Sequence, residues 1–150
     1  MTEIDVEING DSVEKLKKHL TKVKGDLKDL KHPLQKVTVA LDRWVQKNFK
    51  GEGVNVGGWK PFARGGRING DKIDTSAKLL QDTGRLRASF IPFADKNKAG
   101  IGSALSYSIK HEKGIEVPQR RMLPTKKEFE PTADKILNEE VKSILKDKKL

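Results

Sequence analysis

The sequence predicts an α+β fold in which a small antiparallel sheet is packed by a long N-terminal helix pair and a C-terminal helix. Three observations support this prediction. Apolar residues recur at helical spacing before residue 50 and again after residue 132, and shorter segments alternate between apolar and polar residues. Helices at both ends of the chain with short strands between them are typical of α+β architecture.

The chain begins with a segment that alternates between apolar and acidic residues. Ile4, Val6 and Ile8 are separated by acids, which predicts a short amphipathic strand. Turn-forming residues follow, and Asp11 and Glu14 have the spacing of a capping box. We therefore expect a strand, a turn and the start of a helix.

Two helices are predicted between residues 11 and 50. The first has apolar residues at 13, 16, 20, 23, 27 and 30 and ends near Lys31, where His32-Pro33 interrupts it. The second begins at Pro33. Its apolar stripe consists of Leu34, Val37, Leu41, Trp44, Val45 and Phe49. The stripes fit core packing in a hairpin or kinked pair, and a coiled-coil seam between subunits is the alternative.

Residues 50–77 are expected to form a long, flexible loop with little structure of its own. Seven of the thirteen glycines fall between Gly51 and Gly70. Loops of this length inside a compact domain are usually functional or disordered. Trp59 and Phe62 place two large aromatic side chains in the loop, so one point of it should be fixed on the core.

The next segment predicts a short helix and a hairpin. The helix is expected over 78–81 and ends at Thr83-Gly84, with glycine just past its last turn. Alternating residues from Leu86 to Phe93 predict a strand, and residues 99–103 predict a second strand that pairs with it.

A helical turn is expected from Tyr107 to Glu112, closed by Gly114, and residues 117–124 should be extended. The last helix should begin near Thr132. Its apolar stripe lies at residues 133, 136, 137, 141, 144 and 145. Residues 1–150 are expected to form a single domain.

The composition excludes several classes of site. The chain has 150 residues and no cysteine, which excludes disulfides, cysteine-containing zinc sites, iron–sulfur clusters and thiol nucleophiles. His19, His32 and His111 are too dispersed for a metal site, and no cofactor is expected. No apolar run approaches the roughly 18 residues of a membrane span. Without a secretion signal, the expectation is a soluble, intracellular protein.

The net charge of +10 is unevenly distributed. Residues 1–11 carry four acids and no base, whereas residues 12–50 carry a net +7 and residues 51–124 a net +6. A basic surface implies a polyanionic neighbour, either nucleic acid or an acidic protein surface. The alternative is that lysine-rich helices are simply solvated.

The known catalytic and phosphate-binding motifs do not match this chain. Gly53 and Gly58 have phosphate-loop spacing, but Trp59 stands where lysine is required. On a helix, the adjacent side chains of His111 and Glu112 point about 100° apart and do not form a dyad.

Ser103 and Ser106 lie near His111 in the sequence, but no third group or oxyanion loop accompanies them. No enzyme is predicted. The proline at the helix junction also argues against a DNA-reading helix-turn-helix.

Four blocks of sequence occur in order between residues 49 and 124. They are Phe49 with Gly58-Trp59-Lys60-Pro61-Phe62, Leu79-Leu80-Gln81-Asp82-Thr83-Gly84-Arg85-Leu86-Arg87-Ala88-Ser89-Phe90, Ile101-Gly102-Ser103 with Tyr107, His111, Glu112 and Gly114, and Pro118-Gln119-Arg120-Arg121-Met122-Leu123-Pro124. In order and spacing they resemble the blocks of phage virion morphogenesis proteins, also called tail-completion proteins. Ser108 and Arg121-Met122 depart from the family's pattern. The head–tail connector (neck) family has a similar layout and stays an alternative.

The resemblance implies packing and assembly roles for the motif residues. These are Trp59, Pro61, Thr83, Gly84, Leu86, Ser89, Gly102, Ser103, Tyr107, His111, Gly114, Pro118 and Arg120. Basic residues that could contact a partner or DNA are Lys60, Arg64, Arg67, Arg85, Arg87 and Arg121, with solvation as the alternative. From the residues alone, Tyr107 and His111 lie one helical turn apart and share a packing face, with His111 as a hydrogen-bonded packing histidine.

The resemblance also implies a structural bacteriophage protein of the head–tail junction that completes the tail and helps to join it to the head. Its partners would be other phage neck and tail proteins and copies of itself in a ring, commonly sixfold, with DNA passing nearby. It would assemble in the bacterial cytoplasm and reside in the virion. We hypothesise that loop 50–77 and the acidic N-terminal strand make subunit contacts. The alternative function is a free basic nucleic-acid-binding protein held by phosphate contacts.

Overall fold

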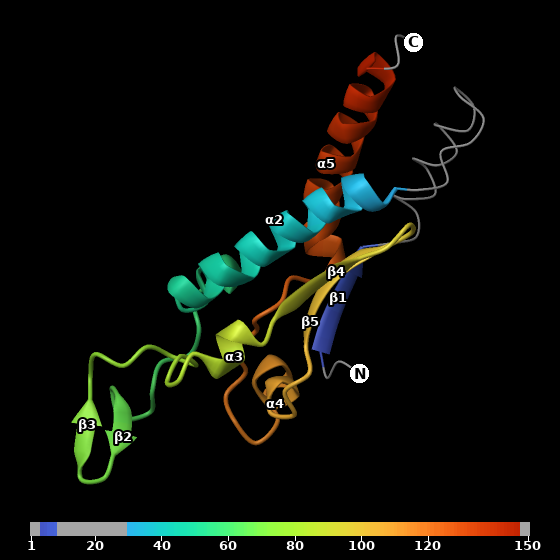
Figure 1. Cartoon of the computed structure of the whole chain (residues 1–150). Coiled ribbons are helices and arrows are strands. Elements are labelled where there is room, and N and C mark those ends of the chain that lie inside the picture. Colours follow the sequence, from blue (N-terminus) through green and yellow to red (C-terminus); the bar gives the residue numbers. More distant parts are fainter. Residues whose placement is uncertain (1–3, 9–29, 148–150) are drawn as a thin grey trace. The chain divides into compact units, whose positions relative to one another are not determined.

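A computed structural model of the chain describes residues 4–8 and 30–147 (Figure 1). Its elements are β1 (Ile4–Ile8), α2 (Lys31–Lys50), the 3-10 turn η1 (Val54–Val56), β2 (Arg67–Asn69), β3 (Lys72–Asp74), α3 (Arg85–Ala88), β4 (Ile91–Ala94), β5 (Ala99–Ser103), α4 (Ser108–Lys113) and α5 (Lys126–Asp147). The contacts divide the described chain into two compact units. The first unit comprises 4–5, 43–91 and 102–123, and the second comprises 6–8, 30–42, 92–101 and 124–147.

A three-stranded sheet has the order β1-β5-β4, which confirms the predicted α+β class. The alternation of β1 is also confirmed, because Ile4, Val6 and Ile8 are buried while Asp5 is exposed. A Cβ added at Gly102 would lie 2.6 Å from the Ile4 carbonyl oxygen. Glycine in β5 therefore allows the backbone of β1 to approach closely.

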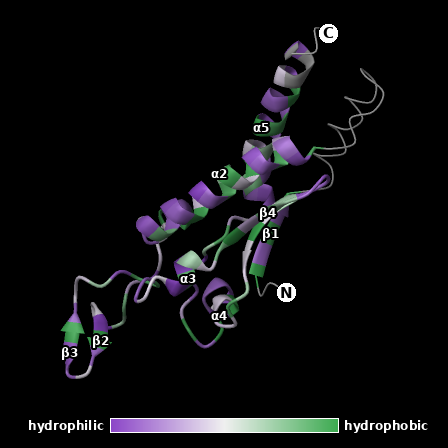
Figure 2. Ribbon diagram, viewed as in Figure 1, coloured by the Kyte–Doolittle hydropathy of each residue, from purple (hydrophilic) through white to green (hydrophobic). Residues whose placement is uncertain are grey.

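The amphipathic stripe of α2 is confirmed except at Trp44, which is half-buried. Leu34, Val37, Leu41, Val45 and Phe49 are fully buried, and Figure 2 shows apolar and polar residues interleaved along this helix. Because the apolar positions recur every three or four residues, one side of the helix packs against the core. The helix begins at 31, two residues before the predicted start, and the predicted first helix lies almost wholly outside the described residues.

The expectation that residues 50–77 lack structure of their own is wrong. The segment contains η1 and an antiparallel hairpin of β2 and β3, in which Ile68 lies opposite Ile73 and Asn69 opposite Lys72. The two-residue connection begins with Gly70, whose φ of 61° suits a tight hairpin turn. The alternation around this turn is a strand signal that the high glycine content concealed.

The predicted helix over 78–81 and the strand from Leu86 are also wrong. Residues 78–81 form turns, and Leu80 has a positive φ of 60°, which is incompatible with a helix. Gly84 precedes α3 instead of ending a helix, and β4 begins only at Ile91. The buried side chains of Leu86 and Phe90 fit a helical turn as well as a strand, so their spacing did not decide the element.

The second half of the predicted hairpin is confirmed. β4 and β5 are neighbours in the sheet, and the Asp95 side chain accepts hydrogen bonds from the backbone N–H groups of Asn97 and Lys98 in the connecting turn. The predicted helical turn is α4, and Gly114 closes it in a left-handed conformation with φ of 74°.

The C-terminal helix begins at Lys126, six residues before the predicted start. Thr125 and Glu128 form a reciprocal capping box: Glu128 N–H donates to Thr125 Oγ1 over 3.1 Å, and Thr125 N–H donates to the Glu128 carboxylate over 3.0 Å. The helix forms from this cap onward even though Pro131, which cannot donate a backbone hydrogen bond, lies inside α5. None of the helices in the described parts of the chain is long and apolar enough to cross a membrane.

Candidate functional site

The first unit contains an open hollow of about 360 Å³ lined by residues from four separate segments. Eight lining residues are among those singled out from the sequence: Arg67, Thr83, Gly84, Arg85, Leu86, Tyr107, His111 and Arg120. Three were not expected to have a packing, assembly or contact role at a site: Phe62, Leu80 and Asp82. We call this site the arginine hollow.

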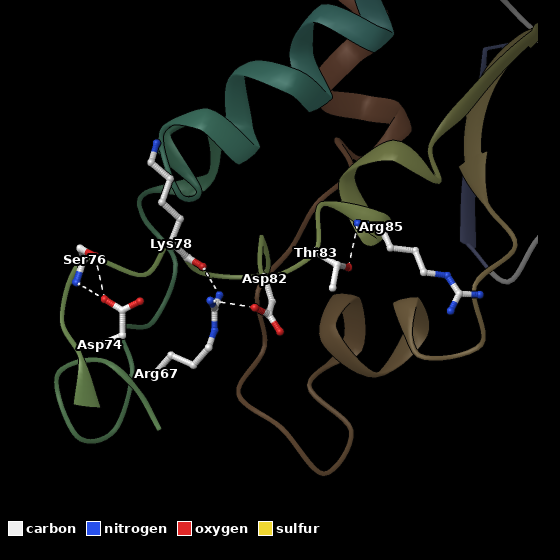
Figure 3. A network of polar contacts seen from close by, with 7 residues as sticks. All are labelled: Arg67, Asp74, Ser76, Lys78, Asp82, Thr83 and Arg85. Carbon is white, nitrogen blue, oxygen red and sulfur yellow. Dashed lines mark hydrogen bonds and ion pairs between the residues drawn. The ribbon is translucent and has the colours of Figure 1, made fainter. Parts of the chain in front are cut away.

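The turn at Thr83-Gly84 forms one wall of the arginine hollow. Gly84 has φ of 75°, and a Cβ at this position would meet no atom within 4 Å. Glycine is therefore required by the backbone conformation and not by a lack of space. The Thr83 hydroxyl accepts a hydrogen bond from the Arg85 backbone N–H over 3.2 Å, which fixes the start of α3 (Figure 3).

Two arginines of the arginine hollow are held by other parts of the protein. Arg67 pairs with Asp82 over 3.0 Å and donates to the Lys78 carbonyl over 3.0 Å (Figure 3). Arg120 is almost buried and donates through Nε to the Lys60 carbonyl over 2.8 Å and through Nη2 to the Pro61 carbonyl over 3.3 Å. Both therefore fasten loop segments, although each keeps its positive charge.

Arg85 is different. Its side chain is exposed and points away from the Arg67–Asp82 pair (Figure 3). Across the described ranges, its guanidinium makes no hydrogen bond or ion pair. Arg85 is thus a cation at the arginine hollow that is available to a ligand.

Tyr107 and His111 form the opposite wall on and beside α4. Their rings lie 6.5 Å apart at 90°, so the predicted shared packing face is confirmed. The prediction that His111 is hydrogen-bonded is not confirmed, because its Nδ1 atom is buried and has no partner in the described structure. Burial, and then the charge of Arg120, lower the pKa of His111, which favours a neutral ring at neutral pH.

Glu112 serves a separate purpose from its neighbour His111. Its carboxylate accepts hydrogen bonds from the backbone N–H groups of Met122 over 2.6 Å and Leu123 over 3.3 Å. Burial raises the pKa of Glu112, and these N–H groups partly oppose that effect. The expected divergence of the two side chains is confirmed, and α4 holds the segment that carries Arg120.

Trp59 fixes the long middle segment on the core, as expected. Its ring packs edge-on against Phe49 with centroids 5.2 Å apart. Its indole N–H donates to the Arg121 carbonyl over 2.8 Å, and buried Asn48 donates to the same oxygen over 3.0 Å. A smaller hollow of about 250 Å³ adjoins Trp59 and Arg121.

The serines of two sequence blocks are joined to each other. Ser89 Oγ lies 2.6 Å from Ser103 Oγ and also donates to the Leu86 carbonyl over 2.6 Å. Ser103 must therefore donate to Ser89, and it accepts the Leu105 N–H over 3.2 Å. None of the hydrogen bonds of the described residues joins Ser103 or Ser106 to His111, so the formal nucleophile–base pair is not formed.

The other residues singled out from the sequence lie outside the arginine hollow. Arg87 is bound to Gln46 over 2.6 Å and to Gln81 over 3.1 Å. Lys60 and Arg64 are exposed, as are Pro61 and Pro118. Gly102 lies in the sheet, Gly114 ends α4, and the side chain of Arg121 is half-buried.

Four polar residues support the site in a way that the sequence did not predict. Asn48, Glu52, Gln81 and Glu112 all bind backbone groups of distant segments, such as Leu79 N–H to Glu52 over 2.8 Å and Gln81 Nε2 to the Phe49 carbonyl over 2.8 Å. A polar Asn48 beside the apolar stripe of α2 was a usable signal. The other partners are too distant in sequence for spacing to reveal them.

The comparisons with known proteins give one match. The model of the phage virion morphogenesis family matches residues 11–144, a range that includes all four sequence blocks and the arginine hollow. No curated protein and no solved structure matches the chain. Within the described segments, no group of three or more histidine and carboxylate side chains could hold a metal ion.

Proposed function

The chain belongs to the phage virion morphogenesis family, and we propose that it is a structural protein of the head–tail junction that completes the tail and joins it to the head. The observation that carries this proposal is that motif residues make hydrogen bonds within their own unit. Trp59, Ser103 and Arg120 all bind other parts of their own unit. The motif residues therefore hold their own unit together, as expected of a structural protein.

We propose that the protein acts through binding and not through catalysis. Ser103 is occupied by structural hydrogen bonds, and the Glu112 carboxylate is occupied by two backbone N–H groups. In a general acid–base or nucleophilic site, such groups must be free to face a substrate. Other neck and tail proteins of the virion are the proposed partners, with assembly in the bacterial cytoplasm.

A ring of copies is part of the proposal, and the β2–β3 hairpin supports it. Ile68 and Ile73 lie directly opposite each other and are 56% and 47% exposed. A two-stranded hairpin is marginally stable alone in water. A neighbouring copy that covers the isoleucine pair would stabilise it, in agreement with the hypothesis that segment 50–77 makes subunit contacts.

The experiment that tests the proposed function is deletion of the gene from the phage. We expect DNA-filled heads and finished tails that fail to join, counted by electron microscopy of lysates, with joining restored by the gene supplied in trans. Failure of DNA packaging or of tail-tube polymerisation would contradict the proposal.

The alternative function is free nucleic-acid binding, favoured by the net charge of +10 and by exposed bases such as Lys60 and Arg64. Against it, Arg67, Arg87 and Arg120 are bound within the protein. A DNA affinity of the isolated protein that falls steeply with salt would favour this alternative.

A further inference from the structure

We propose that the arginine hollow receives a carboxylate from an acidic peptide segment of a partner virion protein. The inference rests on the proposed function, because it names the chemistry of one partner contact. It assigns the central role to Arg85.

The charges around the arginine hollow select an anion. Arg67, Arg85 and Arg120 contribute three positive charges, and Asp82 contributes one negative charge that is paired with Arg67. Only Arg85 among these arginines has no partner within the described residues. A guanidinium binds a carboxylate through two parallel hydrogen bonds, which gives both strength and orientation.

The ring of His111 adds a second feature that suits an anion. A neutral imidazole carries one N–H, and placing it on the buried, partnerless Nδ1 would leave a donor unsatisfied. The proton is therefore assigned to Nε2, so the imidazole of His111, which lines the arginine hollow, carries one N–H that can donate. The exposed Tyr107 beside it has a hydroxyl that also donates.

The shape of the arginine hollow favours a peptide over a nucleic acid. Phe62, Leu80 and Leu86 provide apolar lining, and the volume of about 360 Å³ lies in the range of sites that enclose small groups. The phosphate backbone of a nucleic-acid duplex would leave this apolar lining unfilled. An acidic residue next to an apolar residue fits these surfaces better.

The test is an NMR titration of the full-length, ¹⁵N-labelled protein with the capped peptide acetyl-Glu-Leu-Glu-amide. We expect saturable shifts for residues of the arginine hollow, including the Arg85 side-chain N–H, and no saturation with acetyl-Gln-Leu-Gln-amide. Arg85→Gln should weaken peptide binding by about tenfold or more, because a charge-assisted hydrogen-bond pair is lost. Arg43→Gln, at an exposed arginine of the same unit outside the arginine hollow, should bind as the wild type does.

Three outcomes would overturn the inference: no saturable shift, equal weakening by the two variants, or saturation of the same residues by a short DNA duplex. Because Arg85 is exposed, its variant should keep the wild-type melting temperature, so lost binding is not lost folding.

Complementation separates this inference from the proposed function. If deletion leaves unjoined heads and tails but Arg85→Gln restores joining fully, the inference is wrong and the proposed function stands. If deletion does not block joining, the proposed function is wrong whatever the peptide titration shows.

Discussion

His111 carries a pH response that a single substitution can isolate. Burial and Arg120 lower its pKa below the ordinary value of 6.5, so the unfolded chain binds this proton more readily than the folded protein does. The stabilisation from neutral His111 is present above about pH 6.5 and is lost as the pH falls through the lower pKa of the folded state.

We expect the free energy of unfolding to fall more steeply in the wild type than in His111→Gln between about pH 7.5 and pH 5. Urea titrations monitored by circular dichroism measure this difference. Equal slopes for the wild type and His111→Gln would contradict the role of burial.

The role of a single residue was predictable from the sequence where the residue type allows few structural roles. An aromatic residue in a glycine-rich segment predicted the anchor Trp59, which is buried. The position of Asn48 beside the apolar stripe was a usable signal, but its partners Asn55 and Arg121 could not be predicted, because they reach it only in the folded chain.

At the scale of elements, α4 and the segment after it depend on one carboxylate. Glu112→Ala should leave the backbone N–H groups of Met122 and Leu123 without their acceptor. We expect this loss to lower the free energy of unfolding by about 1–3 kcal/mol. Glu112→Gln should cost less, because its amide oxygen still accepts these bonds.

The measurement is urea unfolding together with hydrogen exchange of the two amides. We expect exchange at Met122 and Leu123 to accelerate in the alanine variant and to change little in the glutamine variant. Unchanged protection in both variants would show that the carboxylate does not hold this segment.

The regular patterns of α2 and β1 were predicted correctly, whereas α3 and the hairpin of β2 and β3 were not. The stripe of α2 and the alternation of β1 leave one interpretation each. The four residues of α3 fit either a helical turn or a strand, and the hydrogen bond from the Ala88 N–H to the Gly84 carbonyl makes them a helical turn. The predicted start of α5 near Thr132 was wrong because the hydrogen bonds between Thr125 and Glu128 begin the helix at Lys126, before Pro131.

At the scale of the whole molecule, the isoleucine pair of the hairpin should control self-association. We expect the wild-type protein to form a ring-sized species and the double variant Ile68→Ser, Ile73→Ser to shift toward monomer, measured by analytical ultracentrifugation. Each serine removes exposed apolar surface that a neighbour would bury.

The matched control is Val39→Ser, which changes an apolar residue of α2 that is 51% exposed and lies outside the hairpin. It should leave the mass distribution unchanged. If both proteins shift alike, or the double variant retains the wild-type mass, the hairpin is not the subunit contact.

The arginine hollow as a whole was beyond sequence reasoning, although eight of its residues were singled out. The spacing of residues along the chain identified the blocks, but only the folded unit shows that Arg67 and Arg120 are bound internally and that Arg85 is not. Whether a side chain is available to a ligand depends on its neighbours in the folded structure, which the sequence does not show directly.

The shared carbonyl of Arg121 also sets an order of events during synthesis. Trp59 and Asn48 bind this oxygen from 62 and 73 residues earlier in the chain. Ribosomes add about 5–20 residues per second, so the synthesis of Arg121 follows that of Trp59 by roughly 3–12 s. During this interval the tryptophan and the segment that it anchors lack this hydrogen bond. That part of the chain is then accessible to proteases and chaperones.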